Sequence, residues 1–308
     1  MVKKNYNKNL ISVIINCHNG EKYLHTAIKS VISQTYTNWE IVFWDNKSTD
    51  RSASIIKNFK DKRIKYFYAK KFTNLHKARN YAIKKSKGTF ISFLDADDYW
   101  ADNKLSLQIK KFKDKNVNLV YGNYWMFNEN YIFKKKIYFN FTLPSGYILN
   151  ELLKKYIIGL PTVIIRKSTL KNLKYIFDSS FKIIGDFDLC IRLSEKNKFE
   201  CVQEPIAYNR IHDDSLSIKN RSVLTKELSN WIKSARKGKY GKNIAINKNL
   251  KFVQDKIDFL KRIDNINKNK NIFQLTSFLI KNFNSYNLKI FTKALTPKYI
   301  LKKLTIFG

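Results

Sequence analysis

Long apolar runs are missing from this sequence of 308 residues, in which no stretch of 18 or more uninterrupted apolar residues occurs. A helix that crosses a bilayer needs about 20 such residues. The first nine residues are polar, and no apolar run precedes a cleavage site as it would in a secretory signal. We therefore expect a protein that is neither secreted nor membrane-spanning.

Cysteine is also scarce. The three cysteines, Cys17, Cys190 and Cys201, lie in apolar segments and show no CxxC spacing. A zinc site or a disulfide framework is therefore not expected, and a reducing cytoplasm is the expected location.

Acidic residues are few: 24 Asp and Glu stand against 59 Lys and Arg, which gives a formal net charge of +35. Such an excess is typical of proteins that bind nucleic acid or anionic membranes. Lysine, asparagine and isoleucine are abundant while arginine is scarce, so the base composition of the genome is an alternative source. Residues 219–308 carry 21 Lys and Arg against four acids. This basic, aromatic-dotted segment predicts contact with an anionic membrane surface, as a peripheral protein at its inner face.

Strand-like and helix-like patterns alternate in the first hundred residues. Apolar, β-branched or aromatic runs predict strands at 11–15, 40–44, 64–68 and 90–94, and apolar residues at three- and four-residue spacing predict helices at 23–34, 50–59 and 76–85. Alternation at intervals of about 25 to 30 residues indicates βαβ units and a parallel sheet with helices on both faces. The predicted class is α/β with a Rossmann-like half.

The remaining sequence is less regular. Apolar segments at 118–127, 131–139, 146–158, 161–165 and 201–211 predict a mixed, partly antiparallel continuation of the sheet. From about residue 220 helix-like patterns such as Val253, Ile257, Leu260 and Ile263 take over. We expect a catalytic domain over 1–218, with halves at about 10–100 and 101–218, and a basic helical region over 219–308.

The acidic cluster Asp95-Ala96-Asp97-Asp98 follows the predicted strand 90–94 directly. Like charges this close are costly unless a cation neutralises them, and Mg²⁺ or Mn²⁺ uses one or two protein carboxylates together with substrate phosphates. Such a metal stabilises the charge of a departing diphosphate. The alternative is an acidic loop that caps the following helix. Its place at a strand end, where parallel sheets bind ligands, favours the metal site.

Three further polar stretches follow apolar segments. Asp45 to Asp50 follows the second strand, where a carboxylate can accept hydrogen bonds from a nucleoside; turn formation is the alternative. Asp186 begins a helix whose apolar face is 187–193, and it is either a helix cap or the general base of a transferase. Arg210 and His212 follow an apolar run, where they can meet a diphosphate or a metal.

Together these segments resemble the family 2 glycosyltransferases, an inverting group with the GT-A fold, over roughly residues 10–217. The matching segments are 12–15, 19–24, 30–35, 39–42, 45–46, 48–50, 78–80, 87–88, 93–98, 186–192 and the stretch Arg210, His212, Ser215 and Ser217. Their order and spacing are far more specific than any one of them.

The resemblance implies a role for each of these residues. Asp186 is the expected base that deprotonates an acceptor hydroxyl, giving one displacement with inversion at the anomeric carbon. Asp95, Asp97 and His212 are the expected metal ligands. The expected donor-binding residues are Asn16, His18, Asn19, Glu21, Asp45, Asn46, Arg79, Asp95, Ala96, Asp97 and Arg210. The expected partners are a nucleotide-sugar donor, by default a UDP-sugar, and a glycan or lipid-linked acceptor in surface polysaccharide synthesis.

Two departures from the family stand out. Gly185 replaces the acidic residue that often precedes the base, and His18 replaces the usual aromatic residue of the first loop. Nucleotidyl transfer is a second enzyme hypothesis, but it predicts a glycine-rich triphosphate loop that residues 16–21 lack. Nucleic-acid binding, motivated by the charge, is the hypothesis from another class, and we do not expect it.

Overall fold

The computed structural model describes residues 9–128, 135–212, 220–238 and 240–269. The chain divides into two compact units, Met1–Arg210 and Ile211–Gly308. The predicted boundary between residues 218 and 219 lies outside the described residues, within the stretch 213–219, and it stays a prediction.

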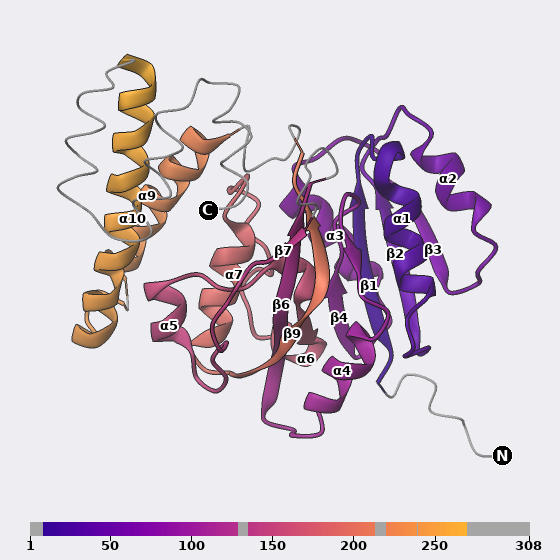
Figure 1. Cartoon of the computed structure of the whole chain (residues 1–308), viewed down its shortest axis with the longest axis horizontal. Coiled ribbons are helices and arrows are strands. Elements are labelled where there is room, and N and C mark those ends of the chain that lie inside the picture. Colours follow the sequence, from indigo (N-terminus) through magenta and orange to yellow (C-terminus); the bar gives the residue numbers. More distant parts are fainter. Residues whose placement is uncertain (1–8, 129–134, 213–219, 239, 270–308) are drawn as a thin grey trace. The chain divides into compact units, whose positions relative to one another are not determined.

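The predicted βαβ half is confirmed. Its strands pair in parallel in the order β3-β2-β1-β4, and Figure 1 shows them side by side. The strands are β1 (Ile11–Cys17), β2 (Trp39–Asp45), β3 (Ile64–Tyr68) and β4 (Phe90–Phe93), and the helices between them are α1 (Glu21–Ile32), α2 (Ser52–Asn58) and α3 (Leu75–Lys85). All these elements lie within a few residues of the predicted bounds.

The mixed continuation is confirmed as well. From β4 the order continues β8-β6-β9-β5, with β7 beside β6; β8 is antiparallel to β4 and β6, whereas β6 and β9 are parallel. The strands are β5 (Tyr99–Trp100), β6 (Val117–Phe127), β7 (Lys135–Ile137), β8 (Ile164–Arg166) and β9 (Lys198–Arg210); the helices are α4 (Lys104–Lys111), α5 (Leu149–Lys154), the 3₁₀ turn η1 (Leu160–Thr162), α6 (Lys167–Leu170) and α7 (Gly185–Ser194).

The prediction was wrong for one segment of this continuation. Residues 146–158 contribute a single bridge, from Gly146 to Phe199, and then form helix α5. The reason is spacing, because Leu149, Leu152 and Leu153 repeat with the period of a helix and bury Leu152 and Leu153.

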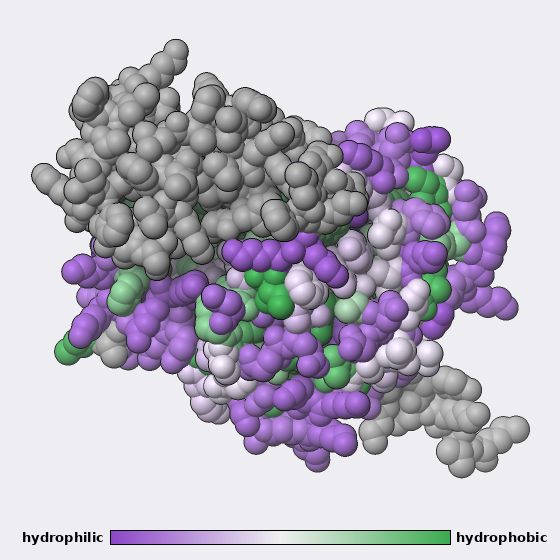
Figure 2. Space-filling model, in the orientation of Figure 1, coloured by the Kyte–Doolittle hydropathy of each residue, from purple (hydrophilic) through white to green (hydrophobic). Residues whose placement is uncertain are grey.

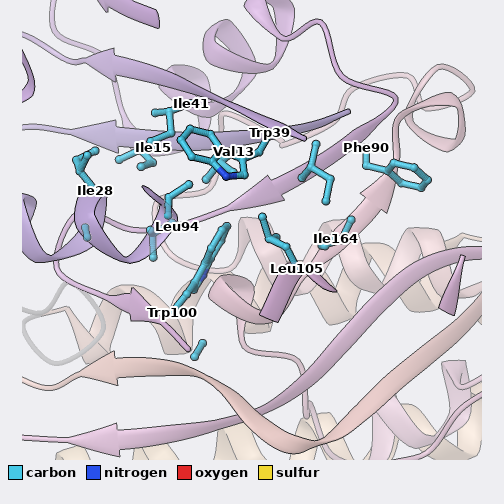
Figure 3. Close-up of a cluster of buried hydrophobic side chains, with 14 of the residues drawn as sticks. Val13, Ile15, Ile28, Trp39, Ile41, Phe90, Leu94, Trp100, Leu105 and Ile164 are labelled. Carbon is cyan, nitrogen blue, oxygen red and sulfur yellow. The ribbon is translucent and has the colours of Figure 1, made fainter. Parts of the chain in front are cut away.

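Both faces of β1, β2 and β4 are covered, whereas β3, at the end of the strand order, is partly exposed. Val13, Ile15 and Ile41 point to the face that packs against Ile28 of α1 and against Trp100 and Leu105 (Figure 3). The alternate residues, such as Ile14 and Val42, are buried on the other face, where α3 packs against β1 and β2. This two-sided burial explains why the strands are almost continuously apolar.

The second unit contains α9 (Arg221–Lys237) and α10 (Ile244–Asn269), which pack against each other. Its predicted helical character is confirmed for these residues. Among the described residues, no helix is both long and apolar enough to cross a bilayer. Where Figure 2 colours the described residues, the face shown is mostly hydrophilic, with hydrophobic residues in small groups.

Candidate active site

Two loops at the carboxyl ends of β1 and β2 are bound to each other by hydrogen bonds. Asn19 adopts a left-handed backbone (φ 55°), and its Oδ1 accepts from the Thr49 amide at 2.8 Å. Glu21 Oε2 accepts from the Arg51 amide at 3.0 Å and pairs with the guanidinium at 3.1 Å. Both side chains therefore hold the loops together, and their predicted contact with a donor stays a prediction.

Asp45 and Asn46, at the end of β2, are both buried. Asp45 accepts from the Ser48 amide at 2.7 Å and from the Tyr66 hydroxyl at 2.8 Å, and burial together with this carboxylate raises the pKa of Tyr66. The Asn46 amide donates to the Thr73 carbonyl at 2.7 Å. These partners fix the loop that borders the site, and Tyr66 is a contributor that the sequence pattern did not single out.

Asn16 is unusual because its amide is buried and neither its nitrogen nor its oxygen has a hydrogen-bond partner. Buried polar groups without partners are rare and costly, and functional sites are one place where they persist. Asn16 lies at the end of β1, opposite Trp44 in the β1–β2 register. This amide is the described group of the first loop best suited to hydrogen-bond a bound molecule.

Helix α3 connects several parts of the site through the sequence Ala78-Arg79-Asn80. Ala78 packs in the core, while Arg79, with its side chain only 5% exposed, forms an ion pair with Asp95 at 2.5 Å. The Asn80 amide donates to the Phe177 carbonyl at 2.8 Å and accepts from the Phe177 amide at 3.0 Å. The motif therefore joins the acidic cluster to the segment that precedes Asp186.

The three carboxylates of the acidic cluster have different environments. Asp98 is buried, and it accepts hydrogen bonds from the Arg210 amide at 2.8 Å and from Asn209 at 3.0 Å. Burial raises the pKa of Asp98, and the nearby charges of Asp97 and Asp95 raise it further. Asp98 therefore supports the end of β9, whereas Asp95 and Asp97 remain partly exposed.

Arg210 contacts the loop that carries the acidic cluster. Its Nε donates to the Asp97 carbonyl at 2.8 Å, and its guanidinium lies 4.2 Å from the Tyr23 ring centre and 4.6 Å from that of Phe127. Ala96 faces Gly20 so closely that a Cβ at Gly20 would stand 3.3 Å away. The predicted contacts of Arg210 and Ala96 with a donor stay predictions.

The acidic cluster fits a hard divalent cation. Asp95 and Asp97 are both partly exposed and offer carboxylate oxygens within three residues of the chain. Among the described residues no group of three His, Cys, Asp or Glu converges on one point. A site of two carboxylates is what Mg²⁺ or Mn²⁺ uses when substrate phosphates and water complete its coordination.

Asp186 lies in the first turn of α7, so the predicted helix is confirmed, and the helix buries Phe187, Leu189, Cys190, Ile191 and Leu193. Burial raises the pKa of Asp186; the Arg79 guanidinium opposes this rise, and the Asp95 carboxylate adds to it. The structure thus brings Asp186 within electrostatic range of the Arg79–Asp95 ion pair. A carboxylate with a raised pKa is a stronger base and suits proton abstraction.

Gly185 has a packing role that explains its departure from the family pattern. A Cβ at this position would lie 2.5–2.6 Å from three ring atoms of His76. His76 is buried, stacks 5.6 Å from the Phe177 ring, and accepts a hydrogen bond from the Gly185 amide at 3.3 Å. Burial lowers the pKa of His76 to about 3. Sequence reasoning missed His76 because it lies 109 residues from its partner.

The two histidines predicted as site residues, His18 and His212, belong to different units of the chain. His18 Nδ1 lies 3.0 Å from the Asn46 carbonyl, and its ring centre lies 4.6 Å from that of Phe72, which is 59% exposed. An aromatic pair is therefore present beside the first loop. His212 belongs to the second unit, and its predicted role as a metal ligand stays a prediction.

A parallel half-sheet with acids at its strand ends, joined to a mixed half in which Asp186 lies within electrostatic range of those acids, is the arrangement of the GT-A class of glycosyltransferase. Residues 12–173 match the family model described as glycosyl transferase family 2. The chain belongs to this family. The predicted family, fold and enzyme class are thereby confirmed.

Three similar proteins add detail. WfgD of Escherichia coli, named as a UDP-Glc:alpha-D-GlcNAc-diphosphoundecaprenol beta-1,3-glucosyltransferase, is 37% identical over 168 residues, which are 54% of this chain and 64% of that protein. WfaP of the same species carries the same activity in its name and is 32% identical over 229 residues, 73% of this chain and 86% of WfaP. The structure of S. aureus TarS 1-349 with UDP-GlcNAc has a TM-score of 0.67 at 19% identity and covers 93% of this chain and 81% of that chain.

The first of these matches spans just under two thirds of WfgD. The likeness to TarS lies below 25% identity and shows the fold alone.

Proposed function

We propose that this chain transfers a sugar from a UDP-sugar to a hydroxyl of a lipid-diphosphate-linked acceptor sugar, with inversion, in surface polysaccharide synthesis. The observation that carries the proposal is that Asp186 lies within electrostatic range of the Arg79–Asp95 ion pair, so a base at this position would act next to a diphosphate held by the acidic cluster. The names of WfgD and WfaP support UDP-glucose as donor and GlcNAc-diphosphoundecaprenol as acceptor.

In the proposed reaction the acceptor hydroxyl oxygen bonds to the anomeric carbon while the bond from that carbon to the diphosphate oxygen breaks. The electron pair leaves with UDP, and the hydroxyl proton passes to Asp186. A single displacement from the face opposite the leaving group inverts the anomeric configuration. The raised pKa of Asp186 favours this proton transfer.

Asp97 and Asp95 would hold a Mg²⁺ or Mn²⁺ ion, which supplies charge stabilisation to the departing diphosphate. Arg79 orients Asp95 through the ion pair, and Arg210 holds the backbone of Asp97. On the donor side, the unpartnered Asn16 amide and the His18–Phe72 pair border the place where the nucleoside would bind.

A transfer assay tests the proposal. Purified full-length protein, UDP-glucose, MnCl₂ and a synthetic GlcNAc-diphospho-lipid should yield a disaccharide-lipid with the β configuration, detected by mass spectrometry and NMR. Asp186→Asn should bind donor normally and reduce kcat by about 10²-fold or more. Because burial disfavours the charged carboxylate, this variant should be at least as stable as the wild type. Asp102→Asn, an exposed control, should keep full activity.

Transfer at the wild-type rate by Asp186→Asn would remove this residue as the base. No transfer from any UDP-sugar to any diphospho-lipid acceptor, with donor binding absent as well, would remove the proposed function.

We also propose that the second unit binds an anionic membrane surface, where a lipid-linked acceptor resides. In α9 the residues Leu228, Trp231 and Ile232 are buried, whereas Lys233, Arg236 and Lys237 are exposed. Reversing these three charges to Glu should weaken binding to vesicles that contain phosphatidylglycerol, since each basic residue near such a surface contributes about 1 kcal/mol. Unchanged vesicle binding by the triple variant at low salt would contradict this role.

A further inference from the structure

A strip of aromatic rings is formed by β6 and by the residues that follow β7. Tyr124 on β6 stacks against Tyr138 with ring centres 4.7 Å apart and an interplanar angle of 20°. Phe139 lies edge-on to both rings, at 5.8 Å from Tyr124 and 4.5 Å from Tyr138. Phe141 follows at 5.4 Å from Phe139. We call these four residues the aromatic strip.

The inner end of the aromatic strip lies within electrostatic range of Asp98 and of Asp186, the proposed base. Burial raises the pKa of Tyr124, and the nearby charges of Asp98 and Asp186 contribute to the same rise. The Tyr124 ring also packs against Gly159, where a Cβ would stand 2.8 Å from the ring. The inner ring therefore lies within electrostatic range of the base and is held by close packing.

The outer end is exposed and cationic. Tyr138 is 42% exposed and Phe141 is 41% exposed. Lys155, at the end of α5, places its Nζ 4.5 Å from the centre of the Phe141 ring. Burial raises the pKa of Tyr121, and the charge of Glu151, in the first turn of α5, adds to this rise.

The aromatic strip is rigid on its backbone side. The Asn123 amide donates to the Phe139 carbonyl at 2.7 Å, and its oxygen accepts from the Phe139 amide at 3.2 Å. The Tyr138 amide donates to the Tyr124 carbonyl at 2.9 Å. Exposed rings held this firmly lose little entropy when a ligand covers them, which is a property of binding surfaces.

We propose that the aromatic strip and Lys155 form the acceptor subsite. The acceptor sugar stacks on Tyr138 with its hydroxyl toward Asp186, and Lys155 pairs with the diphosphate that joins this sugar to its lipid. An apolar face next to a cation matches an acceptor that has a sugar ring followed by two phosphates. This inference rests on the proposed function and adds to it the residues that select the acceptor.

Steady-state kinetics of the full-length protein test the subsite. Tyr138→Ala and Phe141→Ala should raise the KM for GlcNAc-diphospho-lipid by about 3- to 10-fold, in keeping with the usual strength of aromatic contacts, with an unchanged KM for UDP-glucose. Tyr147→Ala removes a side chain that is 72% exposed and outside the aromatic strip, and it should leave both constants unchanged.

A second pair of acceptors isolates the role of Lys155. Lys155→Gln should raise the KM for the diphospho-lipid acceptor by about 5- to 10-fold, as expected for an exposed charge-assisted contact, but not the KM for an alkyl GlcNAc glycoside without phosphate. Lys171→Gln, a change at the exposed lysine that directly follows α6, is the matched control.

The possible outcomes separate the proposals. If the wild type transfers sugar and the strip variants keep a normal acceptor KM, the subsite is wrong while the proposed function stands. If the variants lose vesicle binding but keep a normal acceptor KM in detergent, the strip is a membrane contact and the subsite is again wrong. If the wild type transfers to no acceptor, the proposed function itself fails.

Discussion

Gly185→Ala is a small change for which the structure gives a definite cost. The added Cβ would lie 2.5–2.6 Å from three His76 ring atoms, against 3.4–4 Å for an ordinary contact. The His76 ring is buried and stacked on Phe177, so it has no open space to move into. Overpacking of this kind costs about 1–3 kcal/mol, and the helix preference of alanine returns less than about 1 kcal/mol. We expect a net destabilisation of about 1–2 kcal/mol.

The clash should also move Asp186, because Gly185 and Asp186 share the first turn of α7. A base shifted by about 1 Å reduces kcat by about 10- to 100-fold, while donor binding on the other side of the site stays normal.

Urea unfolding and kinetics of Gly185→Ala, His76→Ala and the double variant measure the effect as a double-mutant cycle. The His76 deletion should relieve part of the Gly185→Ala defect, with a coupling of about 1–3 kcal/mol. Gly238→Ala, where the nearest atom would be 3.3 Å away, only slightly closer than an ordinary contact, is the milder comparison and should cost less stability. Additive effects, or a Gly185→Ala protein as stable and active as wild type, would refute the steric argument.

Two predictions concern protonation. Burial raises the pKa of Asp186 above the ordinary value of about 3.9, and the proposed base must be ionised to accept a proton. Activity should therefore fall as the pH is lowered through this raised pKa. A pH–rate profile checks this, and a fall in activity only near the ordinary value would contradict it. Burial lowers the pKa of Lys104 well below its usual range, so the unfolded chain binds more protons and the free energy of unfolding rises with pH. Lys104→Met should therefore be more stable than wild type by about 1 kcal/mol at pH 7, allowing for the lost Trp100 ring contact at 3.9 Å and the lost hydrogen bond to the Ser92 hydroxyl at 3.1 Å. The difference in stability should close as the pH approaches 10 in denaturant titrations.

Sequence patterns predicted the positions of the strands and the strand-end acids because both follow from local periodicity. The parallel strands β1, β2 and β4 are almost wholly buried, so their apolar runs are clear, and the residues that follow them fall at one edge of the sheet. The helix α5 was missed because an apolar segment of this length fits a strand or a helix equally well.

Pairings between distant residues could not be predicted in the same way. The contact of His76 with Gly185 and the hydrogen bond from Tyr66 to Asp45 depend on how elements pack, and no spacing in the chain encodes them. The same holds for the division of roles within the acidic cluster. Three carboxylates in four residues look alike in sequence, and only burial separates the supporting one from the others.

That division leads to opposite expectations for two neighbouring, identical changes. Asp98 has a raised pKa and two fixed donors, so the neutral amide of Asp98→Asn can accept from the Arg210 amide, and metal-dependent binding of UDP-glucose should stay near the wild-type value. Asp97→Asn instead removes a charge from the proposed metal site and should abolish that binding in calorimetric titrations with MnCl₂. Equal losses in both variants would mean that Asp98 also serves the metal. Unchanged binding by Asp97→Asn would mean that the cluster does not hold one, and Asp186 would then have to act on a donor bound without its help.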